Sequence, residues 1–379
     1  MKLIVNAGEH NRNFCPVSVK FDTKKLKCEC GKAHRVALKD IDSGNEIPVQ
    51  CECDGGDEAT LSWIVTGLGI HENKTYEASI IHEKSESKGG VELALTEESH
   101  IDVNVEGKPF TSYLFSSEHQ RPYMYPVLGP QGKEVTECPT SDHPHHRSLY
   151  VAYGEVNEVD VWSEGKNAGY IRHQDFKKVK SGVVVGKIVS ENLWVSKEGK
   201  ELMTDMREYR IYNVPETGRI IDLDLTFIAS HGDVYFGDTK EGGIVSVRVN
   251  TPMRVSNGGK IENAFGGINE PETWGIKSNW CDYSGIVDDV HLGICVFDHI
   301  KNPRYPTYWH VRNYGLMGSN IFGGSTFESD PSKDGSYTLK SGEKMEFRFR
   351  VYVHEGDAQK GNVGQKYHDF INPPKIEVK

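Results

Sequence analysis

Long hydrophobic runs are missing from this sequence. Its first apolar run covers only residues 3–5, whereas the apolar core of an export signal needs about 7 to 15 residues. No window approaches the about 18 to 20 uninterrupted apolar residues of a membrane-spanning helix, because charged residues or glycines break every run. These absences predict a soluble, cytoplasmic protein with no membrane partner.

The sequence also lacks an excess of positive charge. It has 44 Lys and Arg residues against 55 Asp and Glu residues, which gives a formal net charge of −11. Such a chain would repel a phosphate backbone unless it segregated a basic patch, and no such patch is visible. We therefore exclude DNA and RNA as partners.

Several common sequence signatures are absent as well. We find no long helical periodicity, internal repeat, coiled-coil heptad, phosphate-binding glycine-rich loop or serine-centred nucleophile elbow. A short helix is expected only near residues 365–370. The fold must therefore come from another kind of pattern.

That pattern is alternation with a period of two. Residues 221–227 and 345–351 both place apolar side chains at every second position, with polar residues between them, as expected for half-buried strands. The 39 glycines fit many tight turns between such strands. The sequence predicts an all-β protein dominated by a large antiparallel β-sandwich.

A polar segment at residues 81–90 separates two blocks. The first block, residues 1–90, has expected strands at 17–21, 59–65 and 75–81, and we interpret it as a small N-terminal β-sandwich domain. The second block, residues 91–379, would form the large sandwich and carry the active site.

The 8 cysteines are expected to be free thiols in a chain without an export signal. Two Cys-x-Cys pairs, Cys28/Cys30 and Cys51/Cys53, could place four thiolates around a structural zinc, because residues i and i+2 share one face of a strand. The alternative is that all four pack as small apolar residues.

One segment concentrates groups that carry acid–base chemistry. Three imidazoles, a carboxylate and a guanidinium occur together at Asp142, His143, His145, His146 and Arg147. Histidine both gives and accepts a proton near neutral pH, and such groups are costly to bury without a purpose. In an extended segment His143 and His145 would face one side and His146 the other. A solvated loop is the alternative.

A second group precedes the strand expected at residues 244–249. Glu241 lies beside glycines in a turn onto that strand, which favours a position at the rim of a sheet. It is a candidate general acid or base, and Lys240 or Arg248 could stabilise an anion nearby. An exposed charged hairpin is the alternative.

A third group interleaves aromatic and hydrogen-bonding residues. Sugar rings stack on aromatic faces while carboxylates, arginines and histidines bind their hydroxyls, so this mixture favours a carbohydrate. A core with polar edges would look similar. The expected substrate-binding side chains are His146, Arg147, Trp162, His173, Tyr283, Asp298, Trp309 and Arg312.

Three motifs together resemble the PmoA-like family: residues 142–147, 238–242 and 309–316. That family carries the label "methane oxygenase", which we reject here because methane oxygenase subunits are membrane proteins and this chain has no spanning segment. The family is similar at fold level to the galactose-mutarotase-like supersandwich. By analogy with aldose epimerases, the resemblance implies that His143 or His145 acts as an acid and Glu241 as a base.

We therefore expect a carbohydrate-processing enzyme that performs glycoside cleavage, elimination or epimerisation on a sugar or oxidised sugar. The expected catalytic residues are His143, His145, Glu241 and His310. No cofactor is certain, but a divalent metal could bind His143, His145, His173 and His310. A non-catalytic carbohydrate-binding protein is the alternative function, and a homo-oligomer stays open.

Overall fold

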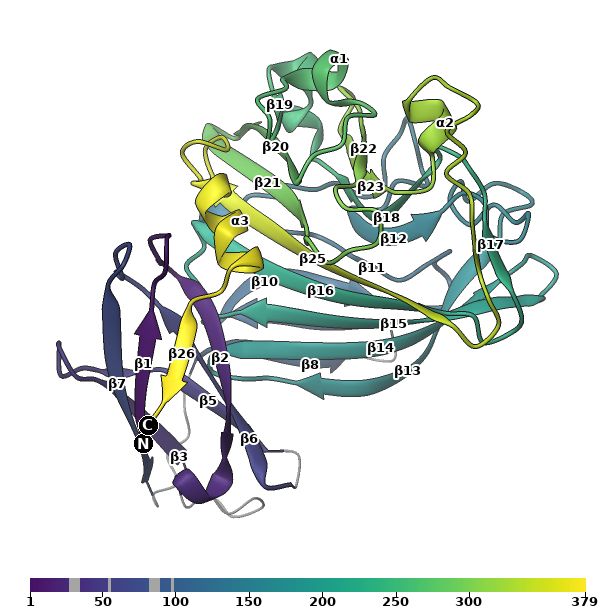
Figure 1. Ribbon diagram of the computed structural model, residues 1–379. Helices are drawn as coiled ribbons and strands as arrows, with labels where there is room; N and C mark the ends of the chain where they lie inside the picture. The colour runs from purple at the N-terminus through teal and green to yellow at the C-terminus, as the bar shows by residue number, and fades with distance from the viewer. Residues whose placement is uncertain (27–34, 54–55, 82–88, 97–98) are drawn as a thin grey trace.

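A computed structural model describes residues 1–379 except 27–34, 54–55, 82–88 and 97–98. Strands dominate it, and every strand pairing among the described residues is antiparallel (Figure 1). No helix in these ranges is long and apolar enough to cross a membrane. The described helices are α1 (Asn269–Thr273), α2 (Gly324–Phe327) and α3 (Val363–Ile371), with 3-10 turns η1 (Thr23–Lys25), η2 (Pro130–Gly132), η3 (Thr251–Met253) and η4 (Val255–Asn257).

A small sandwich forms from the N-terminal part of the chain. Its apolar core is separate from that of the rest of the molecule and centres on Trp63 and Tyr76. The three strands expected in this part are confirmed. One sheet has the order β26 (Lys375–Val378), β1 (Lys2–Asn6), β7 (Asn73–Ile81), β3 (Arg35–Asp40), β4 (Glu46–Ile47), and the other β2 (Cys15–Asp22), β6 (Glu58–Val65), β5 (Val49–Cys53).

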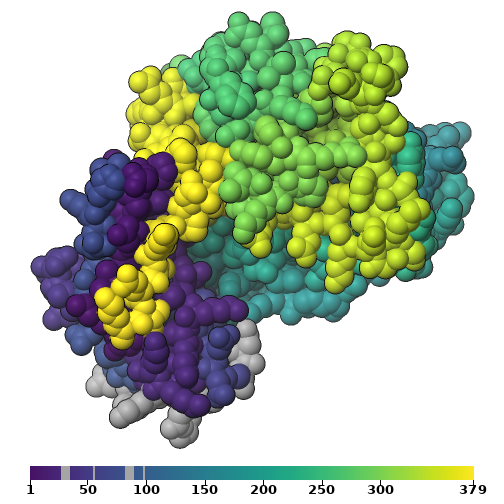
Figure 2. Space-filling view, viewed as in Figure 1, coloured from purple at the N-terminus to yellow at the C-terminus, as the bar shows by residue number. Residues whose placement is uncertain are grey.

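The C-terminal strand returns to this small sandwich. β26 pairs with β1, with Leu3 opposite Val378, so the two ends of the chain lie side by side (Figures 1 and 2). The division of the chain at residue 90 stays a prediction. Residues 375–378 belong to the second predicted block. In the structure they nevertheless form the edge strand of a sheet in the first block.

Two eight-stranded sheets form the large sandwich. The first, here called the site sheet, has the order β22 (Tyr308–Val311), β23 (Leu316–Asn320), β18 (Gly242–Arg248), β12 (Leu149–Tyr153), β11 (Tyr123–Met124), β10 (Lys108–Leu114), β9 (His100–Val105), β8 (Val91–Thr96). The second, the back sheet, has the order β13 (Tyr170–Lys180), β14 (Val185–Val195), β15 (Glu201–Tyr212), β16 (Gly218–Ile228), β25 (Lys344–Glu355), β21 (Val290–Asp298), β20 (Trp280–Val287), β19 (Lys260–Asn263). A two-stranded ribbon, β17 (Val234–Phe236) with β24 (Tyr337–Leu339), lies beside them.

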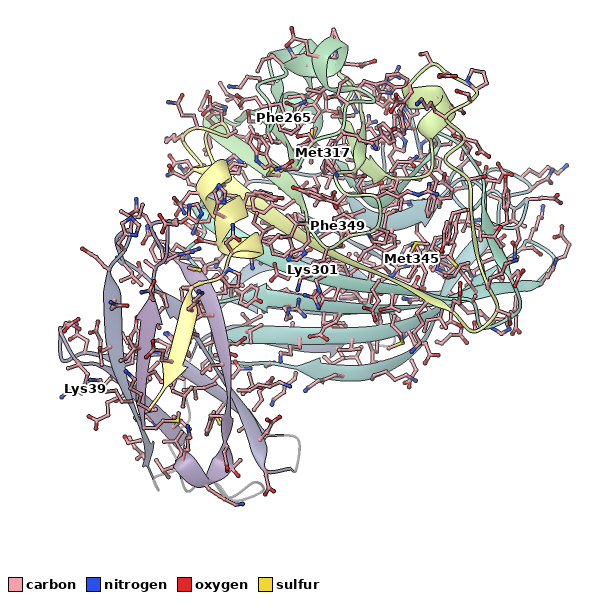
Figure 3. The ribbon with its side chains drawn as sticks, viewed as in Figure 1. Lys39, Phe265, Lys301, Met317, Met345 and Phe349 are labelled. Carbon is pink, nitrogen blue, oxygen red and sulfur yellow. The ribbon has the colours of Figure 1, made fainter. Side chains whose placement is uncertain are left out.

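The main core lies between these two sheets. Met317 of the site sheet and Phe349 of the back sheet, both labelled in Figure 3, belong to it. The two alternating segments of the sequence become neighbouring strands, since β16 pairs with β25 and places Leu225 opposite Phe347. Their apolar faces are buried in this core. The predicted all-β fold, with a large antiparallel sandwich and a smaller N-terminal one, is confirmed.

The polar face of these strands departs from simple alternation. Asp222 and Arg350 are on the outer face of the back sheet, yet both are buried and joined by two hydrogen bonds. The Arg350 guanidinium lies 4.8 Å from the ring of Phe370 on α3. Because α3 covers this part of the sheet, Asp222 and Arg350 form a buried ion pair at positions that the alternating pattern would place in solvent.

The predicted zinc site is only partly within the described residues. Cys28 and Cys30 lie outside them. Cys51 and Cys53 lie two residues apart on β5, and both contact the small apolar core from its edge. Cys53 forms a disulfide bond, whereas the sequence analysis expects free thiols.

Candidate functional site

The candidate site is built on the outer face of the site sheet. Five cross-strand neighbours form a row across this face: Tyr123 is opposite Tyr150, Tyr150 opposite Ser246, Ser246 opposite Gly318, and Gly318 opposite His310. Alternation along each strand directs these side chains away from the main core. The loops that precede β12 and β18 and follow β22 then cover the row with charged and aromatic groups.

The His-rich segment forms a tight turn and is not extended. His146 N–H donates to His143 C=O at 2.9 Å, with Pro144 at the position that favours its fixed φ. Thr140 Oγ1 also binds the carbonyl of His143 and secures the turn. The expectation that His146 would face away from His143 is therefore corrected, and all three imidazoles gather on one loop.

Three aromatic rings form a parallel stack at this turn. The His143 ring lies 4.8 Å from that of His146, with an interplanar angle of 2°, and 4.6 Å from that of Tyr314, with an angle of 9°. His145 stands edge-on to the stack, with its ring 4.4 Å from that of His146. Stacking fixes the directions of the ring nitrogens before any ligand binds.

A buried arginine holds the turn from below. Arg248, at the end of β18, donates two hydrogen bonds to Asp142, at 2.7 and 2.8 Å, and one to Nδ1 of His146 at 3.1 Å. A guanidinium has no acceptor, so Nδ1 of His146 carries no proton and His146 is the neutral tautomer protonated on Nε2. Burial and the charges of His145 and Arg248 lower the pKa of His146 accordingly.

Asp142 completes this support. Burial would raise its pKa, but the hydrogen bonds and charge of Arg248 hold the pKa of this carboxyl well below its usual range. Its Oδ2, which accepts from Arg248, also lies 3.3 Å from Nδ1 of His143. Glu137 accepts from Arg248 at 3.2 Å and pairs with Arg254. Two carboxylates thus balance two arginines, and the turn is anchored to the sheet by charge-assisted bonds.

His145 is the imidazole best placed to reach a ligand. It is half-buried at the tip of the turn, and its ring forms no hydrogen bond with the described residues that would fix its protonation. Burial lowers its pKa, and the charges of Arg121 and His143 lower it further. The ring is therefore mainly neutral at pH 7 and able to accept a proton.

Glu241 approaches from a different strand. It directly precedes β18, half of its side chain is exposed, and it forms an ion pair with Lys240. Its negative charge acts on both His145 and His310, in each case favouring the protonated imidazole. The charge of Glu241 therefore reaches a histidine that lies almost 100 positions away in the sequence.

His310 lies on β22 at the floor of the site. Only 3% of it is exposed, and burial lowers its pKa to about 4 despite the charge of Glu241. Its Nδ1 has no hydrogen-bond partner among the described residues. It is a neutral, buried imidazole that could hold a polar group above it, and it is less accessible than the sequence analysis expects of a catalytic residue.

Arg147 and Trp162 support the turn from its other side. Glu164 accepts from Nε of Arg147 at 3.0 Å and pairs with its Nη2 as well, and this bidentate bond raises the pKa of Arg147. Trp162 is 1% exposed and lies 5.6 Å from His146. Both residues were expected to bind substrate; the structure instead gives Trp162 a packing role beneath the histidines and engages Arg147 with Glu164.

Arg312 lies where expected, at the edge of the site. Its side chain is 32% exposed, its Nε is 3.1 Å from Glu270, and its guanidinium lies 5.5 Å from the ring centroid of Tyr314. The ring of Tyr314 therefore lies between Arg312 and His143, and part of the Arg312 side chain remains open to solvent.

Two expected sugar-binding aromatics belong to the interior. Trp309 and Tyr283 are 0% exposed and part of the main core. The indole of Trp309 donates to Ser278 C=O at 2.9 Å, and the Tyr283 hydroxyl donates to Asn313 C=O at 2.9 Å. Neither ring can stack on a sugar. The alternation of β20 and β22 points both rings inward, which corrects the expectation.

His173 and Asp298 also lie elsewhere. His173 is on β13 of the back sheet and packs against Phe176 and Phe115, with ring centroids 4.0 and 4.8 Å away. Asp298, at the end of β21, is 1% exposed and accepts from Asn302 and from Thr307 N–H. Burial raises the pKa of Asp298 to about 7. Its bonds hold a loop together, so it is no contact for a substrate in this site.

The four histidines expected to bind a metal are not brought together, because His173 lies on the other sheet. Within the described ranges, no three His, Cys, Asp or Glu side chains are grouped so that they could hold a metal ion.

The structural roles of Arg248 and Tyr314 are not apparent from the sequence. The sequence suggests Arg248 only as a group that stabilises an anion, and it suggests no role for Tyr314. An arginine at the end of an apolar strand pattern is one signal that could have found Arg248, because a buried guanidinium needs a carboxylate partner.

A protein-family model matches residues 100–368 of the chain. Its description is "Family of unknown function (DUF6807)". The chain belongs to the DUF6807 family. The matched residues include the turn at residues 142–147 and the side chains of Glu241, His310 and Arg312. The description of the family does not contain the PmoA-like name. No curated protein matches the chain.

The solved structures that are similar to this chain include two with descriptive names. A protein in the glycosyl hydrolase family 38 from Enterococcus faecalis covers 100% of this chain and 47% of its own, at 9% identity and a TM-score of 0.44. This chain therefore spans about half the length of that protein. A GalM/aldose epimerase homologue from C. elegans covers 71% of this chain and 99% of its own, at 10% identity and a TM-score of 0.29. Likenesses this weak carry no argument about the reaction.

Proposed function

We propose that this DUF6807 protein is a carbohydrate-processing enzyme that uses paired histidine and glutamate side chains for acid–base chemistry. The observation that carries the proposal is the turn of three imidazoles, which Arg248 and Asp142 fix on the outer face of the site sheet and which leaves His145 half-buried within reach of the charge of Glu241. His145 and Glu241 are each at least partly exposed, and the charge of Glu241 acts on the imidazole. One group can accept a proton and the other can stabilise the cation that results.

The roles follow from the protonation states. Neutral His145 accepts a proton from a sugar hydroxyl or from a carbon next to a carbonyl, and positive charge then develops on the ring near Glu241. His143 and neutral His146 hold the ligand by hydrogen bonds from directions fixed by the stack. Arg312 steadies negative charge that develops on oxygen. The protonated His145 then gives this proton to the leaving oxygen in elimination or glycoside cleavage, or back to the carbon in epimerisation. In glycoside cleavage water supplies the new hydroxyl group and releases one proton to Glu241.

The test is turnover of a panel of glycosides, keto glycosides and uronic-acid oligosaccharides. Wild type, His145→Ala and Glu241→Gln are compared, with His71→Ala as the control because His71 is exposed and lies in the small sandwich. Turnover that the first two variants abolish and the control retains supports the proposal. Sugar binding without turnover anywhere in the panel would instead favour a non-catalytic carbohydrate-binding protein.

The same assay includes a chelator and added divalent cations. Loss of turnover with the chelator and its recovery with a cation would favour the metal-assisted variant, with ligands recruited around His143, His145 and His310. Turnover that the chelator does not change would favour acid–base chemistry by the side chains without a metal ion.

A further inference from the structure

A hollow adjoins the histidine site at the start of α1. Its volume is about 400 Å³, and it is lined by Glu270, Pro271, Trp274, Arg312 and Asn313. This volume is at the small end of the range for ligand pockets. An aromatic ring, a carboxylate, a guanidinium and an amide around one hollow are the groups that bind sugars through stacking and hydroxyl contacts.

The lining is held rigidly by reciprocal bonds. Asn313 Oδ1 accepts from Glu270 N–H at 3.1 Å, and Glu270 Oε2 accepts from Asn313 N–H at 2.8 Å. The remaining oxygen of Glu270 lies 3.1 Å from Nε of Arg312. These contacts tie α1 to the loop after β22, so the hollow is formed in advance of any ligand.

Trp274 is placed to serve as a platform. It is half-buried, and Phe327 packs edge-on against its ring with a centroid distance of 5.4 Å. Its indole N–H has no hydrogen-bond partner among the described residues. Trp274 nevertheless lines the hollow, so the exposed part of its ring offers a surface on which a sugar ring can stack.

Two contacts of Tyr314 link the hollow to the histidine site. Arg312 lines the hollow and lies 5.5 Å from the Tyr314 ring, which in turn stacks 4.6 Å from His143. The charges of Glu241, from the histidine site, and of Glu270, from the hollow, both act on Tyr314. Tyr314 therefore lies between the two places.

We propose that this hollow is a second sugar subsite and that the substrate is a carbohydrate of at least two rings. One ring binds at His143 and His145, and the next ring stacks on Trp274 with its hydroxyls on Glu270, Arg312 and Asn313. The placement of the first ring at His143 and His145 rests on the proposed function. Binding of the second ring in the hollow can be measured independently of that function.

The experiment compares binding of methyl glycosides of common hexoses and pentoses with binding of the matching disaccharides. It uses the full chain as wild type, Trp274→Ala, Trp274→Phe and Trp280→Phe. Trp280 is also half-buried but packs in a separate cluster near α3, so it is the matched control. Thermal melting checks that each variant is folded.

We expect wild type to bind at least one disaccharide about 10-fold more tightly than its monosaccharide, a difference typical of one good aromatic contact. Trp274→Ala should remove this advantage and leave the monosaccharide Kd unchanged, whereas Trp274→Phe and Trp280→Phe should keep most of it. An equal loss with Trp280→Phe, no advantage for any disaccharide, or no binding across the panel would overturn the subsite.

Turnover separates this inference from the proposed function. Trp274-dependent disaccharide binding without turnover would support the subsite while the proposed enzyme activity fails. Turnover of two-ring substrates whose KM is unchanged in Trp274→Ala would overturn the subsite and leave the enzyme activity intact.

Discussion

Each sheet of the large sandwich contains an arginine that has no exposed side-chain surface and donates two hydrogen bonds to an aspartate. In the back sheet, Arg207 donates to Asp205 at 2.9 and 2.7 Å, and Asp205 also has 0% exposure. Asn192 and Trp194 donate to the same carboxylate at 2.7 and 2.6 Å. In this pair the carboxylate is enclosed and its oxygens are fully used.

The pair in the site sheet differs in its surroundings. Arg248 is equally buried, but the side chains of Asp142 and Glu137 are 32% and 16% exposed. Its remaining hydrogen bond goes to His146, within a stack that reaches solvent through His143 and Tyr314. The same kind of pair thus stabilises the interior in one sheet and orients titratable rings at a surface in the other.

The largest effect is expected in the enclosed pair. Asp205→Ala leaves Arg207 buried without its carboxylate, which should lower the free energy of unfolding by about 3–5 kcal/mol. Urea denaturation measures this. Asp205→Asn, which keeps the shape and removes only the charge, should still lose a large part of that stability. A loss as small as that of a surface substitution would contradict the comparison.

Arg248→Met should reduce turnover much more than it reduces stability. Its carboxylate partners can hydrate, so the unfolding free energy should fall by only about 1–3 kcal/mol. Turnover should nevertheless fall about 100-fold, because the turn and His146 lose the bonds that fix their geometry. Steady-state kinetics and urea denaturation of the same preparation measure both. Full activity in a folded Arg248→Met variant would show that the pair is purely structural.

His310 should make stability depend on pH. Because its pKa falls from 6.5 in the unfolded chain to about 4 in the folded one, the stability that its neutral form provides is complete above pH 6.5 and is lost as the pH falls toward 4. His310→Gln should therefore flatten the loss of unfolding free energy between pH 7 and 5. The exposed His71→Gln is the control, and identical curves for wild type and His310→Gln would refute this account.

The smallest effect is expected for an exposed ion pair. Lys108 and Glu216 lie 3.1 Å apart, with side chains 65% and 35% exposed. Lys108→Ala should change the unfolding free energy by less than about 0.5 kcal/mol and leave turnover unchanged. A larger change would mean that exposure does not separate the structural pairs from the surface ones.

Much of the fold could be predicted because alternation reports burial directly. Leu223 and Leu225 are buried on one face of β16, as their spacing indicates. Asp222, on the other face, could not be predicted to be buried, since its cover comes from α3, which is distant in the sequence. Local pattern determines which way a side chain points but not what lies over it.

The candidate site was predictable as a place and less so in its parts. The density of histidines points to the turn, and the catalytic roles of His145 and Glu241 stay predictions. Trp309 was expected to bind substrate, but it is buried in the core. The identity of an aromatic residue in a strand does not indicate whether its ring points to the core or to the outside. Tyr314 was left out because its importance lies in stacking on His143, a contact across loops that spacing does not reveal.

The most direct test of the central claim is the pH dependence of kcat/KM for any substrate that the panel identifies, measured for wild type, His145→Ala and Glu241→Gln. We predict a bell-shaped profile in wild type, loss of its acidic limb together with a fall of about 10²–10⁴-fold in His145→Ala, and a comparable fall in Glu241→Gln. Equal profiles and rates for wild type and both variants would contradict an active site at this turn.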